Sequence, residues 1–239
     1  MSYPLVMGSD WQIKAAVEHS LKLSALALAC LVFHGCTRSE HSWTADLTDP
    51  DPYVRSLASI GLGLQAPRDA APAIPVLLET IDRSELGLQR PAAELINYLG
   101  VAHTDQLLQI LATEEFMTED RRGAILNALV TAGAKAAGPI VRCLQGPGRA
   151  QAGDLGDALL LIGEPAVPAI SELAASPDEP SLQHFAIFLL ARLGQKARAS
   201  LPILKAALDS PDPGVRQIAR QAIELVDPES EAKIDTGVR

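Results

Sequence analysis

Apolar residues recur at helical spacing through most of this chain of 239 residues. Side chains three or four positions apart lie on one face of an α-helix. One such series near the start of the body is Val54, Leu57, Ala58 and Leu62. A second series near its end is Val215, Ile218, Ala219 and Ile223. No stretch alternates apolar and polar residues as a half-buried strand does, so the pattern predicts an all-α protein.

A nine-residue phrase occurs twice, directly before these two helical patterns. It reads LTDPDPYVR from Leu47 and LDSPDPGVR from Leu208. Asp51 and Asp212 suit the N-cap position, because a carboxylate can accept hydrogen bonds from the unpaired N–H groups of a first helical turn. The proline after each aspartate suits the first position of a helix. The phrase therefore predicts a helix start at each place, and its repetition indicates a repeat protein.

Glycine recurs along the body at intervals of 30 to 37 residues. These glycines are Gly63, Gly100, Gly133, Gly163 and Gly194. Because glycine adopts the left-handed conformation at little cost, each is expected to end the first helix of a pair. In several units a second apolar helix follows with a proline near its start, at Pro75, Pro168 and Pro202. The pattern predicts an α-solenoid of about five to six antiparallel helix pairs over residues 47–225.

These units resemble HEAT repeats, in particular the short HEAT-like form of phycobilisome bilin lyases and many bacterial proteins. The residues that carry the resemblance at one end are Asp51, Pro52, Val54, Arg55, Ala58, Leu62 and Gly63. At the other end they are Asp212, Pro213, Val215, Arg216, Ala219, Ala222 and Ile223. The resemblance covers residues 47–225 and implies an armadillo-type superhelix. It says little about function, since such arrays serve as scaffolds, adaptors, transport factors and a few enzymes.

The resemblance also implies a ladder of hydrogen bonds between neighbouring units. In HEAT arrays the Asp and Arg of the phrase often form it, so the residues expected to build it here are Asp51, Arg55, Asp212 and Arg216. The middle units lack the Val-Arg pair of the phrase. The ladder is therefore expected to be broken there, with Arg121 and Arg122 as the nearby candidates.

Composition narrows the classes of function. Apolar residues make up 48% of the chain and aromatic residues 4%, a balance that suits helix-on-helix packing. The formal net charge of −9 argues against a nucleic-acid binder, because phosphate contacts need clustered lysine and arginine. A DNA-binding role, as in HEAT-like glycosylases, would need a basic groove.

The N-terminal segment carries an apolar run of eleven residues, 23–33. It is too short for a membrane-spanning helix but fits the apolar region of a signal peptide. Gly35 and Cys36 after it resemble the end of a bacterial lipoprotein signal, in which such a cysteine becomes lipidated. We therefore expect a signal peptide over 1–36, lipid attachment at Cys36 and a location at the cell envelope. The alternatives are a site at Cys30, and an N-terminal helix in a cytoplasmic protein.

Polar, aperiodic sequence flanks the repeats on both sides. Residues 37–46 are expected to be a tether, and residues 226–239 a frayed tail.

Motifs that would carry catalysis or bind a cofactor do not stand out. The histidines lack the spacing of a metal site, and neither a nucleophile elbow nor a phosphate-binding loop occurs. We therefore expect no catalytic residues, cofactor, metal or small-molecule substrate. The alternative is an enzyme or enzyme-assisting protein of the bilin-lyase type, which would draw on Cys143, the one thiol of the repeat body.

A row of long polar side chains is the candidate binding surface. It occupies the position four residues after the proline or its equivalent in four of the five second helices, at Glu79, Gln109, Arg142 and Glu172, and the fifth has Ala206 there. Solenoid stacking aligns such positions, often on the concave surface. The sequence thus predicts a non-enzymatic scaffold that binds another protein and is held at a membrane by a lipid anchor.

Overall fold

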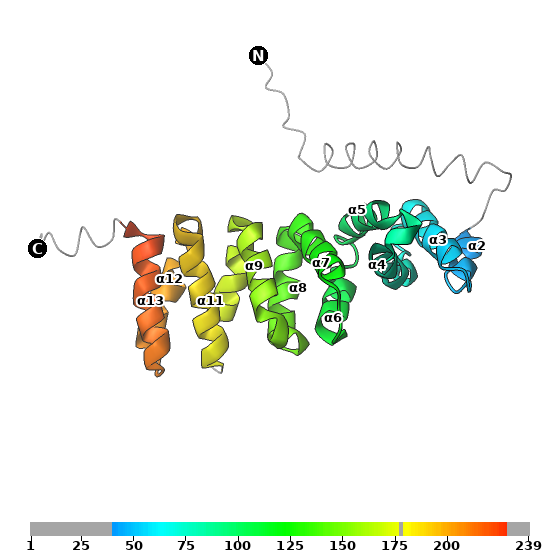
Figure 1. Cartoon of the computed structure of the whole chain (residues 1–239). Coiled ribbons are helices and arrows are strands. Elements are labelled where there is room, and N and C mark those ends of the chain that lie inside the picture. The colour runs from blue at the N-terminus through cyan, green and yellow to red at the C-terminus, as the bar shows by residue number, and fades with distance from the viewer. Residues whose placement is uncertain (1–39, 177–178, 229–239) are drawn as a thin grey trace, which may run out of the picture. The chain divides into compact units, whose positions relative to one another are not determined.

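A computed structural model gives the fold of residues 40–176 and 179–228 (Figure 1). The regular elements in these two ranges are helices, and no strand occurs among them, which confirms the predicted all-α class. The chain divides into two compact units. The first ends at Ala102 and the second begins at His103.

The first unit is built on α3 and the helices packed against it. Its elements are α2 (Glu40–Asp46), α3 (Pro52–Gln65), η1 (Ala71–Ala73), α4 (Ile74–Asp82), η2 (Ser84–Leu86) and α5 (Gln89–Leu99). Helix α3 contacts α2, α4 and α5. It begins where the phrase predicts, because the side chain of Asp51 accepts a hydrogen bond from the backbone N–H of Tyr53 at 2.9 Å.

The expected polar tether over 37–46 is wrong from Glu40 onward, because that part forms helix α2. Trp43 anchors α2 and is only 4% exposed. Its ring lies over Gly61 of α3, where an added Cβ would come within 2.8 Å of the ring. Its indole N–H donates to Oε1 of Gln65 at 3.0 Å. One tryptophan supplies the contact that fixes this helix, which a search for apolar periodicity does not detect. Residues 37–39 lie outside the described ranges.

The second unit is a series of α-helices, several of them joined by short 3₁₀ helices. Its elements are α6 (Thr104–Thr113), α7 (Glu119–Ala132), α8 (Ala134–Leu144), η3 (Pro147–Gln151), α9 (Ala152–Ile162), η4 (Glu164–Ala166), α10 (Val167–Ala174), α11 (Pro180–Leu193), η5 (Gly194–Ser200), α12 (Leu201–Ala206), η6 (Ala207–Asp209) and α13 (Pro213–Val226). The side chain of Asp212 caps α13 through the N–H of Val215 at 3.0 Å, as the phrase predicts.

The helices of the second unit pack in two layers. Helices α7, α9, α11 and α13 contact one another in series, and we call them the odd layer. Helices α6, α8, α10 and α12 do the same and form the even layer. Each helix of the odd layer buries one alanine near its middle: Ala128, Ala158, Ala186 and Ala219. A small side chain at the contact lets neighbouring helix axes approach closely.

Three of the five recurrent glycines end a helix as expected. Gly133, Gly163 and Gly194 have positive φ angles of 59°, 77° and 56° and each follows a helix of the odd layer. The prediction is wrong for Gly63, since α3 continues to Gln65. Gly63 is needed there for space, because a Cβ would lie 2.7 Å from Cδ2 of Leu95. Gly100 follows α5 but keeps a right-handed φ of −54°.

Candidate functional site

Three of the four residues of the predicted binding row lie in the even layer of the second unit. Gln109 belongs to α6, Arg142 to α8 and Glu172 to α10, and all three are exposed. The three helices contact one another in series. Arg142 approaches Asp105 only to 3.6 Å, and both side chains are mostly exposed. An exposed ion pair of this kind contributes little to stability, so either side chain can exchange it for a contact with a partner at little cost.

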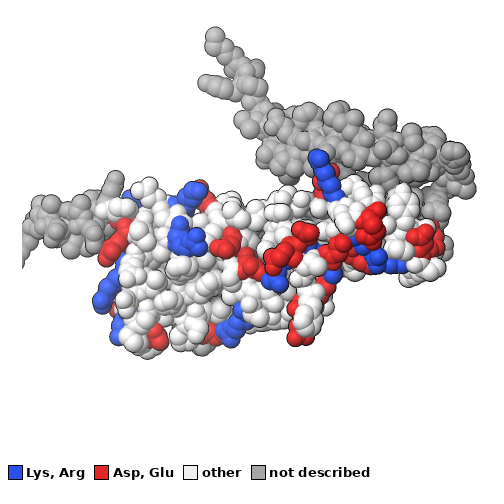
Figure 2. Space-filling model, viewed as in Figure 1, with Lys and Arg blue, Asp and Glu red and all other residues white. Residues whose placement is uncertain are grey.

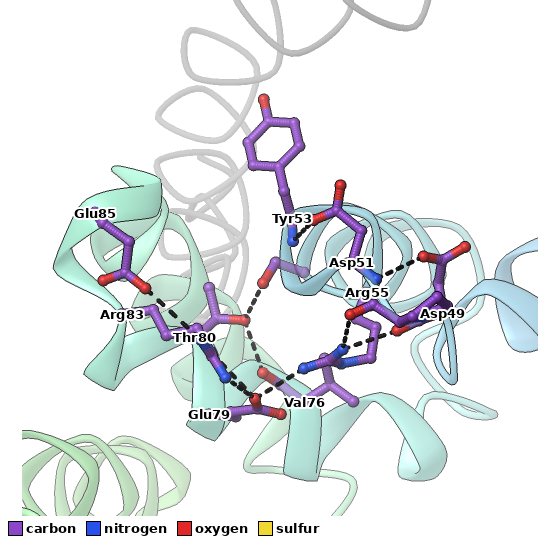
Figure 3. A network of polar contacts seen from close by, with 11 residues as sticks. Asp49, Asp51, Tyr53, Arg55, Val76, Glu79, Thr80, Arg83 and Glu85 are labelled. Atoms are coloured by element: carbon purple, nitrogen blue, oxygen red, sulfur yellow. Dashed lines mark hydrogen bonds and ion pairs between the residues drawn. The ribbon is translucent and has the colours of Figure 1, made fainter.

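The fourth residue, Glu79, lies in the first unit and is already engaged there (Figure 3). Its Oε1 accepts hydrogen bonds from Nη2 of Arg83 at 2.7 Å and from Nη2 of Arg55 at 3.0 Å. The bond from Arg83 is the largest influence lowering the pKa of Glu79; burial opposes it and Arg55 adds to it. Beside this network the hydroxyls of Ser56 and Thr80 share a buried hydrogen bond of 2.8 Å. Glu79 thus ties α4 to the start of α3.

The expected ladder between units is not what the two phrases form. The Nη1 group of Arg55 donates to the carbonyl oxygens of Asp49 at 2.8 Å and Pro50 at 3.1 Å (Figure 3). Arg216 repeats this geometry near the other end of the body. Its Nη1 group donates to the carbonyls of Ser210 at 2.7 Å and Pro211 at 2.9 Å.

Each of these arginines therefore closes the turn that precedes its own helix. The two aspartates of the phrase cap those same helices. The two aspartates and the two arginines thus stabilise the starts of their own helices, and Arg55 also bonds to Glu79. The arginines bind the preceding turn because its carbonyls lie only five and six residues away in the sequence.

The links between neighbouring odd-layer helices occur in the middle of the chain, where the ladder was expected to be broken. Arg122 stands four residues after Thr118, the N-cap of α7, just as Arg55 follows Asp51. Its Nη1 group donates to Oδ2 of Asp154 on α9 at 2.8 Å. This bond is the main reason that the pKa of Arg122 is raised. Arg122 lacks the prolines of the phrase before it, and it reaches the next helix of its layer.

Further pairs continue these links. Arg149 of η3 pairs with Glu179 at the start of α11, and Nη2 of Arg198 lies 3.1 Å from Oδ1 of Asp227 after α13. Arg121 pairs with a residue nearer in the sequence, Glu114, at 2.6 Å. The sequence did not reveal the pairs of Arg122, Arg149 and Arg198, because their partners lie 32, 30 and 29 residues away and follow no shared motif.

The chemistry expected of a catalytic thiol is not favoured at Cys143. Burial raises the pKa of its thiol, and a hydrogen bond from the backbone of Gly148 only partly offsets this effect. A raised pKa leaves less of the thiolate that acts as nucleophile. Among the described residues no group of histidine, cysteine, aspartate or glutamate is placed to hold a metal ion.

The odd layer also exposes three large apolar side chains that the sequence pattern does not distinguish. They are Leu161 on α9, Phe188 on α11 and Leu225 on α13. In the sequence each stands beside core residues of the same type, for example in the run LLLI of α9, so its exposure carries no separate signal.

The expected signal peptide and the lipid attachment at Cys36 lie outside the described residues. Within the described ranges, none of the helices has the length and apolar character needed to span a bilayer. No protein-family model matches this sequence, and no curated protein matches it.

Proposed function

We propose that this chain is a non-enzymatic scaffold that binds another protein through a HEAT-like α-solenoid. The observation that carries the proposal is the exposed row of Gln109, Arg142 and Glu172 on three helices that pack in series. Stacked helix pairs place equivalent positions side by side and so create an extended surface suited to another macromolecule.

The character of the row supports a protein partner. Its side chains are long and polar and include both signs of charge, so they can donate and accept hydrogen bonds across a wet interface. Helix α12 continues the layer, but its equivalent position is the exposed Ala206, so the polar row ends at Glu172. A net charge of −9 does not favour nucleic acid, whose phosphates require clustered cations.

We further propose that the protein is held at the cell envelope through Cys36. A diacylated cysteine gives stable membrane attachment, whereas one acyl chain holds a protein only marginally. Palmitate labelling of the expressed full chain tests this step. Label that disappears in Cys36→Ser supports the anchor, and a protein that stays unlabelled and cytosolic contradicts it.

Affinity capture from the membrane fraction, followed by binding measurements with purified proteins, tests the scaffold role. The variant Gln109→Ala/Arg142→Ala/Glu172→Ala is compared with Lys135→Ala, an exposed residue of the same layer. We expect the triple variant to weaken binding by about tenfold or more, since a few interface residues carry most of the affinity. The control keeps the original affinity. If the full chain retains no protein under any condition, the scaffold role is wrong.

A further inference from the structure

Six exposed side chains form a regular grid on the odd layer, which we call the odd-layer patch. They lie two and six residues before the C-cap residue that follows each helix, and these C-cap residues are Gly163, Gly194 and Asp227. The patch consists of Asp157 and Leu161 on α9, Phe188 and Arg192 on α11, and Gln221 and Leu225 on α13. Each pair is four residues apart and therefore shares one helix face.

Contacts join Asp157, Arg192 and Phe188 directly and place the end of α13 beside the end of α11. Helix α11 contacts both α9 and α13. The guanidinium carbon of Arg192 lies 5.9 Å from the ring centre of Phe188, and Nη1 of Arg192 lies 3.6 Å from Oδ1 of Asp157. On the other side, a Cβ added at Gly194 would lie 3.6 Å from the carbonyl oxygen of Leu225. The ends of α11 and α13 therefore lie level with each other.

The apolar members of the patch are largely open to solvent. Leu161 is 74% exposed, Leu225 56% and Phe188 41%. The same two positions on α7 are the polar residues Asn127 and Thr131. Large apolar side chains at these positions thus occur on α9, α11 and α13, where they alternate with polar ones, but not on α7. Exposed apolar side chains gathered on neighbouring helices and rimmed by polar groups mark a candidate interaction surface.

The charge of the patch selects the kind of partner. Figure 2 shows that the charged side chains on the face over α11 and α13 gather at its upper end and its left edge, whereas the middle of the face is largely uncharged. Within the patch the positive charge of Arg192 is balanced by the negative charge of Asp157. The patch therefore has no positive stripe for nucleic acid or for an anionic membrane. Arginine, as at Arg192, is enriched among the residues that dominate interface affinity, and phenylalanine, as at Phe188, is enriched in interfaces.

We propose that the odd-layer patch binds an amphipathic α-helix of a partner protein. That helix carries large apolar residues along one face and an acidic residue near the middle of it. The inference rests on the proposed scaffold role and assigns a second surface to it, on the layer opposite the polar row.

The dimensions of the layer fit such a helix. Packed helices lie about 8–10 Å apart, so Leu161 and Leu225 at the two sides of α11 are separated by about 20 Å. A helix of about 13 residues spans this distance and offers apolar side chains at every third or fourth position. The acidic side chain of the partner helix forms an ion pair with Arg192. The pair of Arg192 with Asp157 is long and exposed, so it is easily replaced.

A designed peptide provides a defined probe for the full-length protein. It is a labelled helical peptide of about 18 residues, with leucines along one face and one glutamate in the middle of them. Two peptides serve as controls: one with the same composition in scrambled order, and one with lysine in place of the central glutamate. Fluorescence anisotropy gives the dissociation constant of each. We expect the amphipathic peptide to bind at least about tenfold more tightly than the scrambled peptide.

Variants of the protein then locate the site. Phe188→Ala should weaken binding about 30-fold, the loss typical of a central aromatic residue. Arg192→Gln should remove the preference for glutamate over lysine in the peptide. Asn127→Ala/Thr131→Ala, at the same positions of α7, should change nothing. If Phe188→Ala impairs folding, Leu161→Ala replaces it, because that side chain is more exposed.

The inference is overturned if the scrambled peptide binds equally well or if the patch variants leave binding unchanged. Binding to phosphatidylglycerol–phosphatidylethanolamine vesicles that depends on Phe188, without peptide binding, also overturns it and assigns the patch to a membrane. If the peptide fails but a cellular partner still depends on Gln109, Arg142 and Glu172, the scaffold role survives. If the peptide binds specifically but the full chain retains no partner, the odd-layer patch is supported and the scaffold role of the polar row is wrong.

Discussion

The two copies of the repeated phrase share one local geometry and differ in what lies beyond it. In both, an aspartate caps a helix and an arginine binds the carbonyls five and six residues before it. Arg55 also reaches Glu79 on the following helix. Arg216 belongs to α13, the last helix of the described chain, and its hydrogen bonds stay within its turn.

The phrase therefore stabilises its own turn, whereas the neighbouring sequence decides whether its arginine links two helices. Arg122 shows the same dependence in a helix that lacks the phrase. It has the same distance from its N-cap but no proline turn to close, and it bonds to Asp154 on the next helix of its layer. Local motifs thus identify helix starts, whereas long-range links depend on which residues the packing brings near.

The largest difference between the two phrase-bearing helices comes from what covers them. Helix α3 is covered by α2 through Trp43, which is buried against Gly61. Trp43→Ala should lower the free energy of unfolding by about 3–5 kcal/mol, because it leaves a large cavity. Urea denaturation measures this change. Leu225→Ala on α13 is the control and should change stability by less than about 0.5 kcal/mol, since that side chain is mostly exposed. Equal effects would contradict the packing of α2.

Replacing each of the two arginines measures how much the extra bond from Arg55 to Glu79 adds to stability. Arg216→Met should cost about 2 kcal/mol, because two turn carbonyls lose a charged donor. Arg55→Met should cost about 1 kcal/mol more, because the bond to Glu79 is lost as well. Thermal and urea unfolding of the two variants give the values. A larger loss at Arg216 would show that the link to Glu79 adds nothing.

The two aspartates should behave alike, because both only cap their own helices. Asp51→Ala and Asp212→Ala are each expected to lower stability by about 1 kcal/mol. Asp51→Ser and Asp212→Ser keep a capping oxygen and should recover most of the loss. A much larger effect at one aspartate, not recovered by serine, would point to a ladder bond between units after all.

The smallest effect concerns Glu79 and depends on pH. Its lowered pKa means that the ionised form is stabilised in the folded protein. The contribution is present above its ordinary pKa of 4.5 and is lost as pH falls through the lower folded value. Glu79→Gln should therefore cost less than about 1 kcal/mol at pH 7, since the carboxylate is partly exposed. The two proteins should converge in stability as the pH falls below the folded pKa of Glu79. A constant difference across this range would exclude the charge as the cause.

The sequence predicted local structure better than the contacts that join it. The helical class, both N-caps and the glycines at 133, 163 and 194 follow from positions a few residues apart, where backbone geometry restricts the choice. Helix α2 was missed because its stability comes from one side chain, Trp43, packed on a glycine 18 residues later.

The candidate site was predictable only in part. Periodicity correctly identified Gln109, Arg142 and Glu172 as exposed positions. It could not show that Glu79 is already paired with two arginines, since that depends on the fold around it. Nor could it separate Leu161, Phe188 and Leu225 from the core leucines beside them, because exposure is set by which helix lies opposite.

The most direct test of the scaffold role is the dissociation constant of the purified full-length protein for the partner that it retains. We predict that Gln109→Ala/Arg142→Ala/Glu172→Ala weakens binding by about tenfold or more, whereas Cys143→Ser leaves the constant unchanged. A complex that ignores the polar row but is lost, together with a turnover, in Cys143→Ser would contradict the account and indicate an enzyme.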